Sequence, residues 1–284
     1  MKLFKTRQGN IVEHNNQYYR IDLPWDELVN RSGLHHFLQT HLQHAELLSP
    51  VQADALLNSQ LLAPIGAQEV WAAGVTYLRS RDARMEESKD SGGASFYDKV
   101  YEAERPELFF KAHPHRVAAH SEDVYIRRDS SWNVPEPELT LFIDSKGGIE
   151  AYTIGNDMSS RSIEGENPLY LPQAKVYQRS AALGPCLFIP PTPISPLTKI
   201  SMVIHRGDKN VYTGEVAISQ IKRKLSDLAS WLYRDMDFPY GSFLMTGTCL
   251  VPGNEFTLAE GDKVDISIDG IGTLTNTVRY KPSY

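Results

Sequence analysis

Two glutamates separated by one residue, Glu136 and Glu138, stand at the start of an apolar segment. Because successive side chains of a strand point to opposite faces, both carboxylates are expected on one face, with their Cα atoms roughly 6–7 Å apart. Two carboxylates at that separation can bind a single divalent cation. Pro135 and Pro137 flank Glu136, which favours a sheet edge or the irregular end of a strand as the place for such a site.

A third acidic residue, Asp157, ends the next apolar segment at 151–156. A hairpin around the Lys-Gly-Gly sequence at 146–148 would return this segment beside the first and bring three carboxylates together. Such an all-oxygen ligand set suits Mg²⁺, Mn²⁺ or Ca²⁺. The spacing alone leaves an ordinary alternative open, in which the two glutamates lie on a solvated strand face and Asp157 caps a turn.

Most of the elements that must position these residues are predicted to be strands. Beyond residue 106, short apolar segments alternate with Gly, Pro and Asn, a pattern typical of an all-β sandwich or barrel. One helix is predicted at about 217–234, where leucines and an isoleucine recur at helical spacing. That helix face indicates core packing and carries no chemistry.

The N-terminal part has a different pattern. Residues 10–22 are predicted to form two short strands around an Asn-rich turn, and apolar residues at helical spacing follow them. Pro64 and Gly66 mark a boundary. We therefore predict an α+β, predominantly β fold, with a small N-terminal α+β domain over residues 1–65 and a β-rich catalytic domain over residues 66–284.

Composition narrows the class of protein. The chain has 284 residues, 41% of them hydrophobic, and a formal net charge of −6, so neither a nucleic acid nor an anionic membrane is expected as a partner. Cys186 and Cys249 are too few for a disulfide framework or a zinc ribbon. No apolar stretch approaches the about 18 residues of a membrane span. No apolar run follows the basic N-terminus, so a signal peptide is not expected. A cytoplasmic location is expected.

Residues 79–105 are highly charged and contain Ser91-Gly92-Gly93, a sequence that does not favour a helix. We predict helical pieces around a mobile loop that acts as a surface lid. An insertion without a role fits this segment equally well.

Further short motifs follow one another along the chain. They are Gly74–Tyr77, Arg105–Lys111, Gly155–Arg161, Thr246–Thr248, Gly261-Asp262 and Gly270–Gly272. Together with Glu136 and Glu138, their order and spacing resemble the fumarylacetoacetate hydrolase superfamily over about residues 66–280, and within it the 2-keto-3-deoxy-pentonate dehydratases. The resemblance implies a fumarylacetoacetate-hydrolase-like catalytic domain, a divalent metal, a small 2-keto acid as substrate, and a homodimer or higher homo-oligomer.

The resemblance also assigns roles to individual residues. The family's metal ligands fall on Glu136, Glu138 and Asp157, the residues that the strand pattern also indicates. The lysine that meets the substrate's oxygens falls on Lys175, which on its own would be interpreted as a solvated surface lysine. The glutamate beside the metal site of the dehydratases falls on Glu107, which is expected to act as base and acid, although a surface glutamate would be the ordinary interpretation.

Two features favour a dehydratase over a hydrolase of the same superfamily. Hydrolytic members carry a water-activating histidine three residues after the tyrosine that corresponds to Tyr77, and this chain has Ser80 there. Serine cannot take a proton from water near neutral pH without a base of its own. The run at 166–173 before Lys175 is, in addition, similar to the sugar-acid dehydratases.

Two loops of the family place Thr76 and Thr248 as expected substrate contacts, and Arg79 as a contact for the distal hydroxyls. His113 and His115 flank a proline. No third soft ligand accompanies them, so we interpret them as loop residues.

The expected function is therefore a Mg²⁺-dependent dehydratase, with Mn²⁺ or Ca²⁺ as alternative cations. It would eliminate water from a 2-keto-3-deoxy sugar acid, a pentonate that gives 2,5-dioxopentanoate. Chelation of a 2-keto acid also suits a C–C hydrolase or decarboxylase of an acylpyruvate, or a keto-acid-binding protein without turnover, and both remain open.

Overall fold

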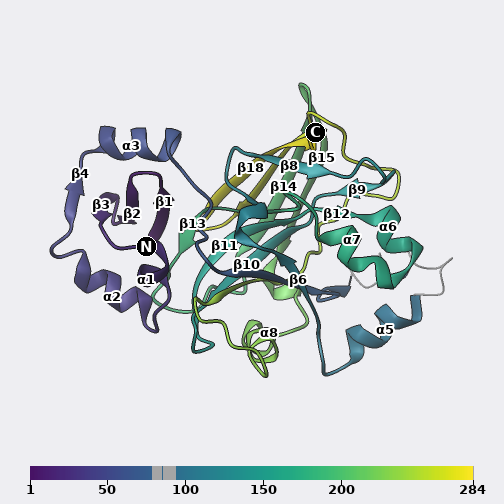
Figure 1. Cartoon of the computed structure of the whole chain (residues 1–284), viewed down its shortest axis with the longest axis horizontal. Helices are drawn as coiled ribbons and strands as arrows, with labels where there is room; N and C mark the ends of the chain where they lie inside the picture. Colours follow the sequence, from purple (N-terminus) through teal and green to yellow (C-terminus); the bar gives the residue numbers. More distant parts are fainter. Residues whose placement is uncertain (79–84, 86–93, 284) are drawn as a thin grey trace.

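The computed structural model describes residues 1–78, 85 and 94–283. Strands make up the centre of the protein (Figure 1). The large sheet contains, in spatial order, β4 (Glu46–Leu48), β3 (Gln17–Ile21), β2 (Gly9–His14), β1 (Lys2–Thr6), β13 (Ala181–Phe188), β11 (Ile149–Asp157), β10 (Pro137–Ile143), β16 (Ser242–Met245), β5 (Glu69–Gly74) and β6 (Glu107–Ala112), with β7 (Val117–Ala118) beside β13. A second sheet contains β15 (Lys209–Ala217), β14 (Lys199–Arg206), β17 (Lys263–Ile268), β18 (Gly272–Tyr280) and β8 (Asp123–Ile126). A short pair is formed by β9 (Asn133–Val134) and β12 (Ser159–Ser160).

Helices are short and lie outside the sheets (Figure 1). The α-helices are α1 (Trp25–Val29), α2 (Leu34–His41), α3 (Pro50–Ser59), α5 (Ala94–Glu102), α6 (Arg161–Glu166), α7 (Leu171–Lys175) and α8 (Leu225–Leu232). Three 3₁₀ turns are η1 (Pro114–Arg116), η2 (Pro168–Tyr170) and η3 (Ile218–Gln220). Among the described residues, no helix has the length and apolar character needed to cross a membrane. The predicted α+β, predominantly β fold is confirmed.

Strand β10 is buried on both faces because separate core layers cover it. Leu141 and Ile143 belong to a core cluster that includes Met202 and Ile266 of the second sheet. Phe142, between them, belongs to the other cluster, to which α2 contributes Leu34. Side chains of one strand alternate in direction, so one β-strand contributes to both layers. The two clusters hold in place the strand that begins at the acidic pair.

The N-terminal strands continue the large sheet. The hairpin predicted at 10–22 is present as β2 and β3, and β1, which the pattern did not predict, joins them to β13 through Lys2↔Phe188 pairing. Figure 1 shows these strands with α1, α2 and α3 at one end of the molecule. A domain division between residues 65 and 66 remains a prediction.

The helix predicted at 217–234 is shorter than expected. Helix α8 begins only at Leu225, after the 3₁₀ turn η3. The intervening residues 221–224 are not helical, and they contact other segments: the Lys222 N–H donates to the Thr76 carbonyl, and Arg223 donates to the carbonyls of Val100, Ala103 and Glu104. Leu228 and Leu232 are fully buried, as the helical spacing predicted.

Candidate metal centre and active site

Three carboxylates converge where β10 begins and β11 ends. One oxygen from each of Glu136, Glu138 and Asp157 lies within 4.8 Å of the others. The predicted hairpin accounts for this: β10 and β11 pair antiparallel, with Glu138 opposite Gly155. The side chains are 3%, 2% and 1% exposed, so the alternative of a solvated strand face is wrong. Among the described residues this is the one cluster of potential metal ligands.

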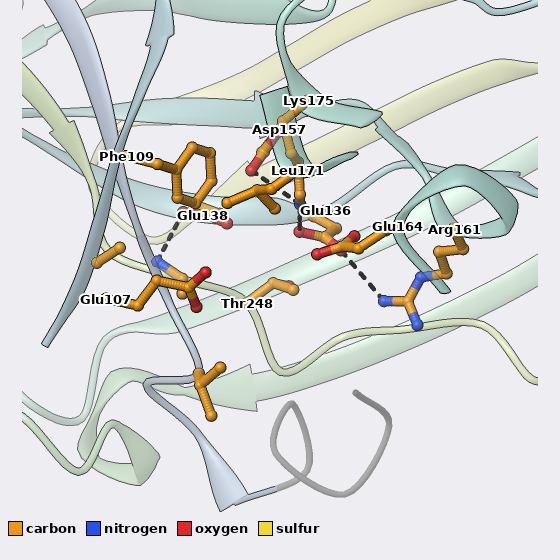
Figure 2. Close-up of a pocket in the computed structure, with 14 residues that line it drawn as sticks. Glu107, Phe109, Glu136, Glu138, Asp157, Arg161, Glu164, Leu171, Lys175 and Thr248 are labelled. Carbon is orange, nitrogen blue, oxygen red and sulfur yellow. Dashed lines mark hydrogen bonds and ion pairs between the residues drawn. The ribbon is translucent and has the colours of Figure 1, made fainter. Parts of the chain in front are cut away.

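Lys175, at the end of α7, points into this cluster and is 1% exposed (Figure 2). Its Nζ donates to Glu136 Oε2 at 2.6 Å, to Asp157 Oδ2 at 3.1 Å and to Ser159 Oγ at 2.5 Å. The ammonium group therefore offsets the charge of two of the three carboxylates. The interpretation as a solvated surface lysine is wrong, and a contact between Lys175 and the substrate's oxygens stays a prediction.

A second buried lysine, Lys111 of β6, was not predicted as a site residue. Its Nζ lies 2.5 Å from Asp157 Oδ1 and donates to the backbone carbonyls of Met158 at 3.0 Å and Lys175 at 2.5 Å. It thus contacts β11 and α7 at once and fixes Asp157 against both. The signal in the sequence was a lysine inside the apolar strand Leu-Phe-Phe-Lys-Ala, because a buried lysine needs acceptors.

The protonation of the cluster follows from burial and these charges. Burial and the neighbouring Asp157 and Glu136 carboxylates raise the pKa of Glu138 well above its ordinary value. Burial would also raise the pKa of Asp157, but the ammonium groups of Lys111 and Lys175 outweigh it and lower that pKa. Without a cation, Glu138 therefore keeps its proton to a higher pH than an ordinary glutamate does.

A loop between β16 and the following segment holds Glu138. The Gly247 N–H donates to Glu138 Oε2 at 2.6 Å. Gly247 has φ +92°, and a Cβ there would lie 2.0 Å from Thr76 Oγ1, so a side chain is excluded. The Thr76 hydroxyl donates to the Thr246 carbonyl at 2.7 Å, so Thr76 contacts this loop and is not among the residues that line the pocket.

These residues fit a divalent cation of the Mg²⁺ type. The donors are oxygens, as Mg²⁺, Mn²⁺ and Ca²⁺ prefer, and no Cys or His belongs to the cluster in the described chain. Lys175, Lys111 and Arg161 form ion pairs with Glu136 and Asp157. The donor set therefore matches the cofactor expected from the sequence.

A pocket opens beside the three carboxylates (Figure 2). Its lining includes Glu107, Thr248 and Lys175 from the predicted site, and also Phe109 and Glu164, which were not predicted. Glu107 begins β6 opposite Gly74 of β5, and a Cβ at Gly74 would lie 2.0 Å from Glu107 Oε2. Glycine at position 74 therefore leaves the space that the Glu107 carboxylate occupies.

Some residues singled out in the sequence are not among the residues that line the pocket. Arg79 and Ser80 fall outside the described residues, as does most of the predicted lid segment. Its described end, α5, contacts the segment before α8: Lys222 Nζ donates to the Tyr101 carbonyl at 2.7 Å. His113 and His115 stack on each other in and beside η1, away from the pocket lining, which agrees with loop residues.

Comparisons of the sequence with known proteins indicate a single family. Residues 70–279 match the family model for the fumarylacetoacetate hydrolase C-terminal region. A probable 2-keto-3-deoxyxylonate dehydratase of Haloferax volcanii is 47% identical over 79% of this chain and 77% of its own. The 2-dehydro-3-deoxy-D-arabinonate dehydratase of Saccharolobus solfataricus is 36% identical over 98% of this chain and 96% of its own.

A solved structure carries the same fold with ligands bound. It is a 2-keto-3-deoxy-D-arabinonate dehydratase complexed with magnesium and 2,5-dioxopentanoate, with a TM-score of 0.85, 33% identity and full coverage of both chains. Sequence and fold thus agree over nearly the whole length. This chain belongs to the fumarylacetoacetate hydrolase family.

Proposed function

We propose that this protein is a Mg²⁺-dependent dehydratase that eliminates water from a five-carbon 2-keto-3-deoxy sugar acid and forms 2,5-dioxopentanoate. The observation that carries the proposal is the buried cluster of Glu136, Glu138 and Asp157 beside a pocket, in a chain similar over nearly its full length to such dehydratases. Glu136, Glu138 and Asp157 would hold the cation. When bound, Mg²⁺ polarises the 2-keto acid as a Lewis acid and makes the C3 protons more acidic.

Lys175 is placed to act on the same end of the substrate. Its ammonium group already lies among oxygens of the cluster, at 2.6 Å from Glu136. All three of its N–H donors are directed at Glu136, Asp157 and Ser159, so one of them must turn from its present acceptor to a substrate oxygen, where it stabilises the negative charge that develops on the C2 oxygen as the C3 proton leaves. Because the Lys175 side chain is buried, no surrounding water has to reorient as the negative charge develops on the substrate.

Glu107 is the group that we assign to proton transfer. Its carboxylate takes a proton from C3, and the C4 hydroxyl leaves as water with a proton that Glu107 returns. One water is lost, and migration of the new double bond toward C5 followed by tautomerisation converts the C5 hydroxymethyl group into the aldehyde. The hydroxyl of Thr248, on the pocket lining, and Arg79 are our candidates for contacts to the substrate hydroxyls.

Hydrolysis of an acylpyruvate on the same scaffold would need a base that activates water. Among the described residues that line the pocket, none is a histidine. Carboxylates are present instead, and a carboxylate suits removal of a proton already acidified by chelation better than activation of water. This composition of the lining favours elimination of water.

The assembly and location of the protein are parts of the proposal that rest on family analogy and composition. We infer a homodimer or higher homo-oligomer in the cytoplasm, with a small-molecule 2-keto acid as the partner.

The role of Glu107 is tested by Glu107→Gln with Glu104→Gln as the matched control, because Glu104 is exposed in the same segment. We expect Glu107→Gln to lose turnover by about 10²-fold or more, while calorimetry finds Mg²⁺ and product binding within a few-fold of wild type, as for a group that acts in the transition state. Full activity of Glu107→Gln would refute the assignment.

A further inference from the structure

Two of the three metal-site carboxylates are in contact with cationic side chains through both of their oxygens. Glu136 Oε1 lies 3.1 Å from Arg161 Nη2, and Glu136 Oε2 lies 2.6 Å from Lys175 Nζ. Asp157 Oδ1 lies 2.5 Å from Lys111 Nζ, and Asp157 Oδ2 lies 3.1 Å from Lys175 Nζ. These side chains are all buried, so solvent and salt screen their charges little. A divalent cation that binds these oxygens must therefore compete with positive groups of the protein.

Lys175 differs from the other two cations in what it contacts. Its three N–H donors go to Glu136 Oε2, Asp157 Oδ2 and Ser159 Oγ, which are all side-chain atoms of this site. It is thus an ammonium group that bridges two of the carboxylates assigned to the metal. Lys111, by contrast, also donates to the backbone carbonyls of Met158 and Lys175, so its position is part of the fold.

The place of Lys175 in the pocket wall gives its ammonium group a second possible acceptor. Figure 2 shows the side chain directed at Glu136 and Asp157, and Lys175 also lines the pocket. An ammonium group has three donors and no more, so a bond to a ligand in the pocket replaces one of the present bonds. An anionic ligand can accept that bond and take up part of the positive charge.

We propose that Lys175 is an internal counter-ion that competes with Mg²⁺ for Glu136 and Asp157, and that an anionic 2-keto acid relieves this competition by accepting a hydrogen bond from it. The protein alone then binds Mg²⁺ more weakly than its carboxylates would without the lysine, and it binds the metal firmly together with the substrate. The inference rests on the proposed function in that these carboxylates hold Mg²⁺ and the pocket takes a 2-keto acid. It adds control of metal uptake to the expected contact between Lys175 and substrate.

The first test is a calorimetric titration of Mg²⁺ into wild type and Lys175→Met without substrate, in a pH range where binding releases no protons from either protein. Lys175→Met should bind Mg²⁺ about tenfold or more tightly, because a like charge next to the binding site is gone. Lys146→Met is the matched control, since Lys146 is exposed in the turn between β10 and β11, and its Mg²⁺ affinity should equal that of wild type. Unchanged or weaker binding in Lys175→Met overturns the inference.

Two further measurements separate charge from folding. Lys175→Arg keeps the positive charge and should bind Mg²⁺ within a few-fold of wild type, and tightening equal to that of Lys175→Met overturns the inference. Lys175→Met leaves buried carboxylates uncompensated, so it should be less stable than wild type with a chelator, and Mg²⁺ should restore its stability. The Mg²⁺ dependence of unfolding then measures affinity even if this variant is unfolded without metal. A variant that stays unfolded at saturating Mg²⁺ overturns the inference.

The titrations are repeated at saturating 2-oxopentanoate, a 2-keto acid with one carboxylate. This ligand should raise the Mg²⁺ affinity of wild type by a larger factor than that of Lys175→Met, because only wild type has a competing lysine to relieve. An equal factor overturns the inference, as does an absence of Mg²⁺ binding by wild type.

Failure of this inference and failure of the proposed function are distinguishable, because turnover of the sugar acid by wild type is measured in parallel. Absence of turnover with the expected Mg²⁺ affinities refutes the dehydratase alone and leaves the counter-ion supported. Turnover by wild type with no gain of Mg²⁺ affinity in Lys175→Met refutes the counter-ion alone.

Discussion

Replacing Lys111 by methionine should destabilise the protein through a single buried charge. The Lys111 Nζ lies 2.5 Å from Asp157 Oδ1, and the two side chains are 0% and 1% exposed. Methionine preserves the length of the side chain but leaves Asp157 without this partner and two carbonyls without a donor. Breaking a buried ion pair from one side costs about 3–5 kcal/mol, so we expect a loss of that order in the free energy of unfolding without metal.

Urea unfolding with a chelator present measures this loss. Lys199→Met is the matched control, because Lys199 also forms an ion pair, with Glu215 at 2.7 Å, but both side chains are more than half exposed. The control should change stability little, since solvent screens an exposed pair. Saturating Mg²⁺ should recover part of the loss in Lys111→Met by compensating Asp157. A loss below about 1 kcal/mol would refute the reasoning that Lys111 carries a charge essential to this site.

The remaining predictions concern the metal centre and the segment near it. Glu138→Gln should weaken Mg²⁺ binding in a calorimetric titration without unfolding the domain. Binding as tight as that of wild type would contradict the assignment of Glu138 as a metal ligand. Because the pKa of Glu138 is raised in the folded protein, its contribution to stability is fully present below its ordinary pKa and is lost as pH rises through the raised value. Mg²⁺ needs the ionised form, so its affinity should rise with pH over that window with release of a proton to the buffer, and a pH-independent affinity would contradict this. Hydrogen exchange in Ala94–Glu102 should slow when a substrate analogue binds, and unchanged exchange there would count against closure of this segment.

The metal ligands could be predicted because their geometry is local. Alternation along one strand places Glu136 and Glu138 together, and a short hairpin brings Asp157 beside them, with Glu138 opposite Gly155. Both steps depend on fewer than about 25 residues of chain and on rules that hold without tertiary contacts. The family resemblance then distinguished this arrangement from an ordinary solvated face.

Residues that reach the site through long-range packing could not be derived in this way. Lys111 and Lys175 are 64 positions apart, yet the first donates to the backbone carbonyl of the second. Helix α7 carries no pattern that orients its lysine inward, and the apolar neighbours of Lys111 in β6 indicate burial but not the carboxylate that it meets. The order of motifs along the chain indicated Lys175, but nothing in that pattern indicated Lys111 or Glu164.

The end of the predicted helix at 217–234 shows how tertiary contacts override spacing. Apolar residues continue at helical intervals through Ile221, but Lys222 and Arg223 donate to carbonyls of the loop after β5 and of the segment at α5. These hydrogen bonds pair backbone carbonyls of other segments, and the backbone just before Leu225 is not helical. Periodicity reports which residues are buried more reliably than where a helix begins.

Product analysis tests the central claim most directly. The purified protein with Mg²⁺ is incubated with a panel of 2-keto-3-deoxy sugar acids and acylpyruvates, and the products are identified by mass and by NMR. We predict that a 2-keto-3-deoxy-pentonate gives one product, lighter by one water and carrying an aldehyde at C5, and that a chelator abolishes its formation. Two shorter fragments from an acylpyruvate, with no reaction of the sugar acid, would contradict the dehydratase and favour a C–C hydrolase.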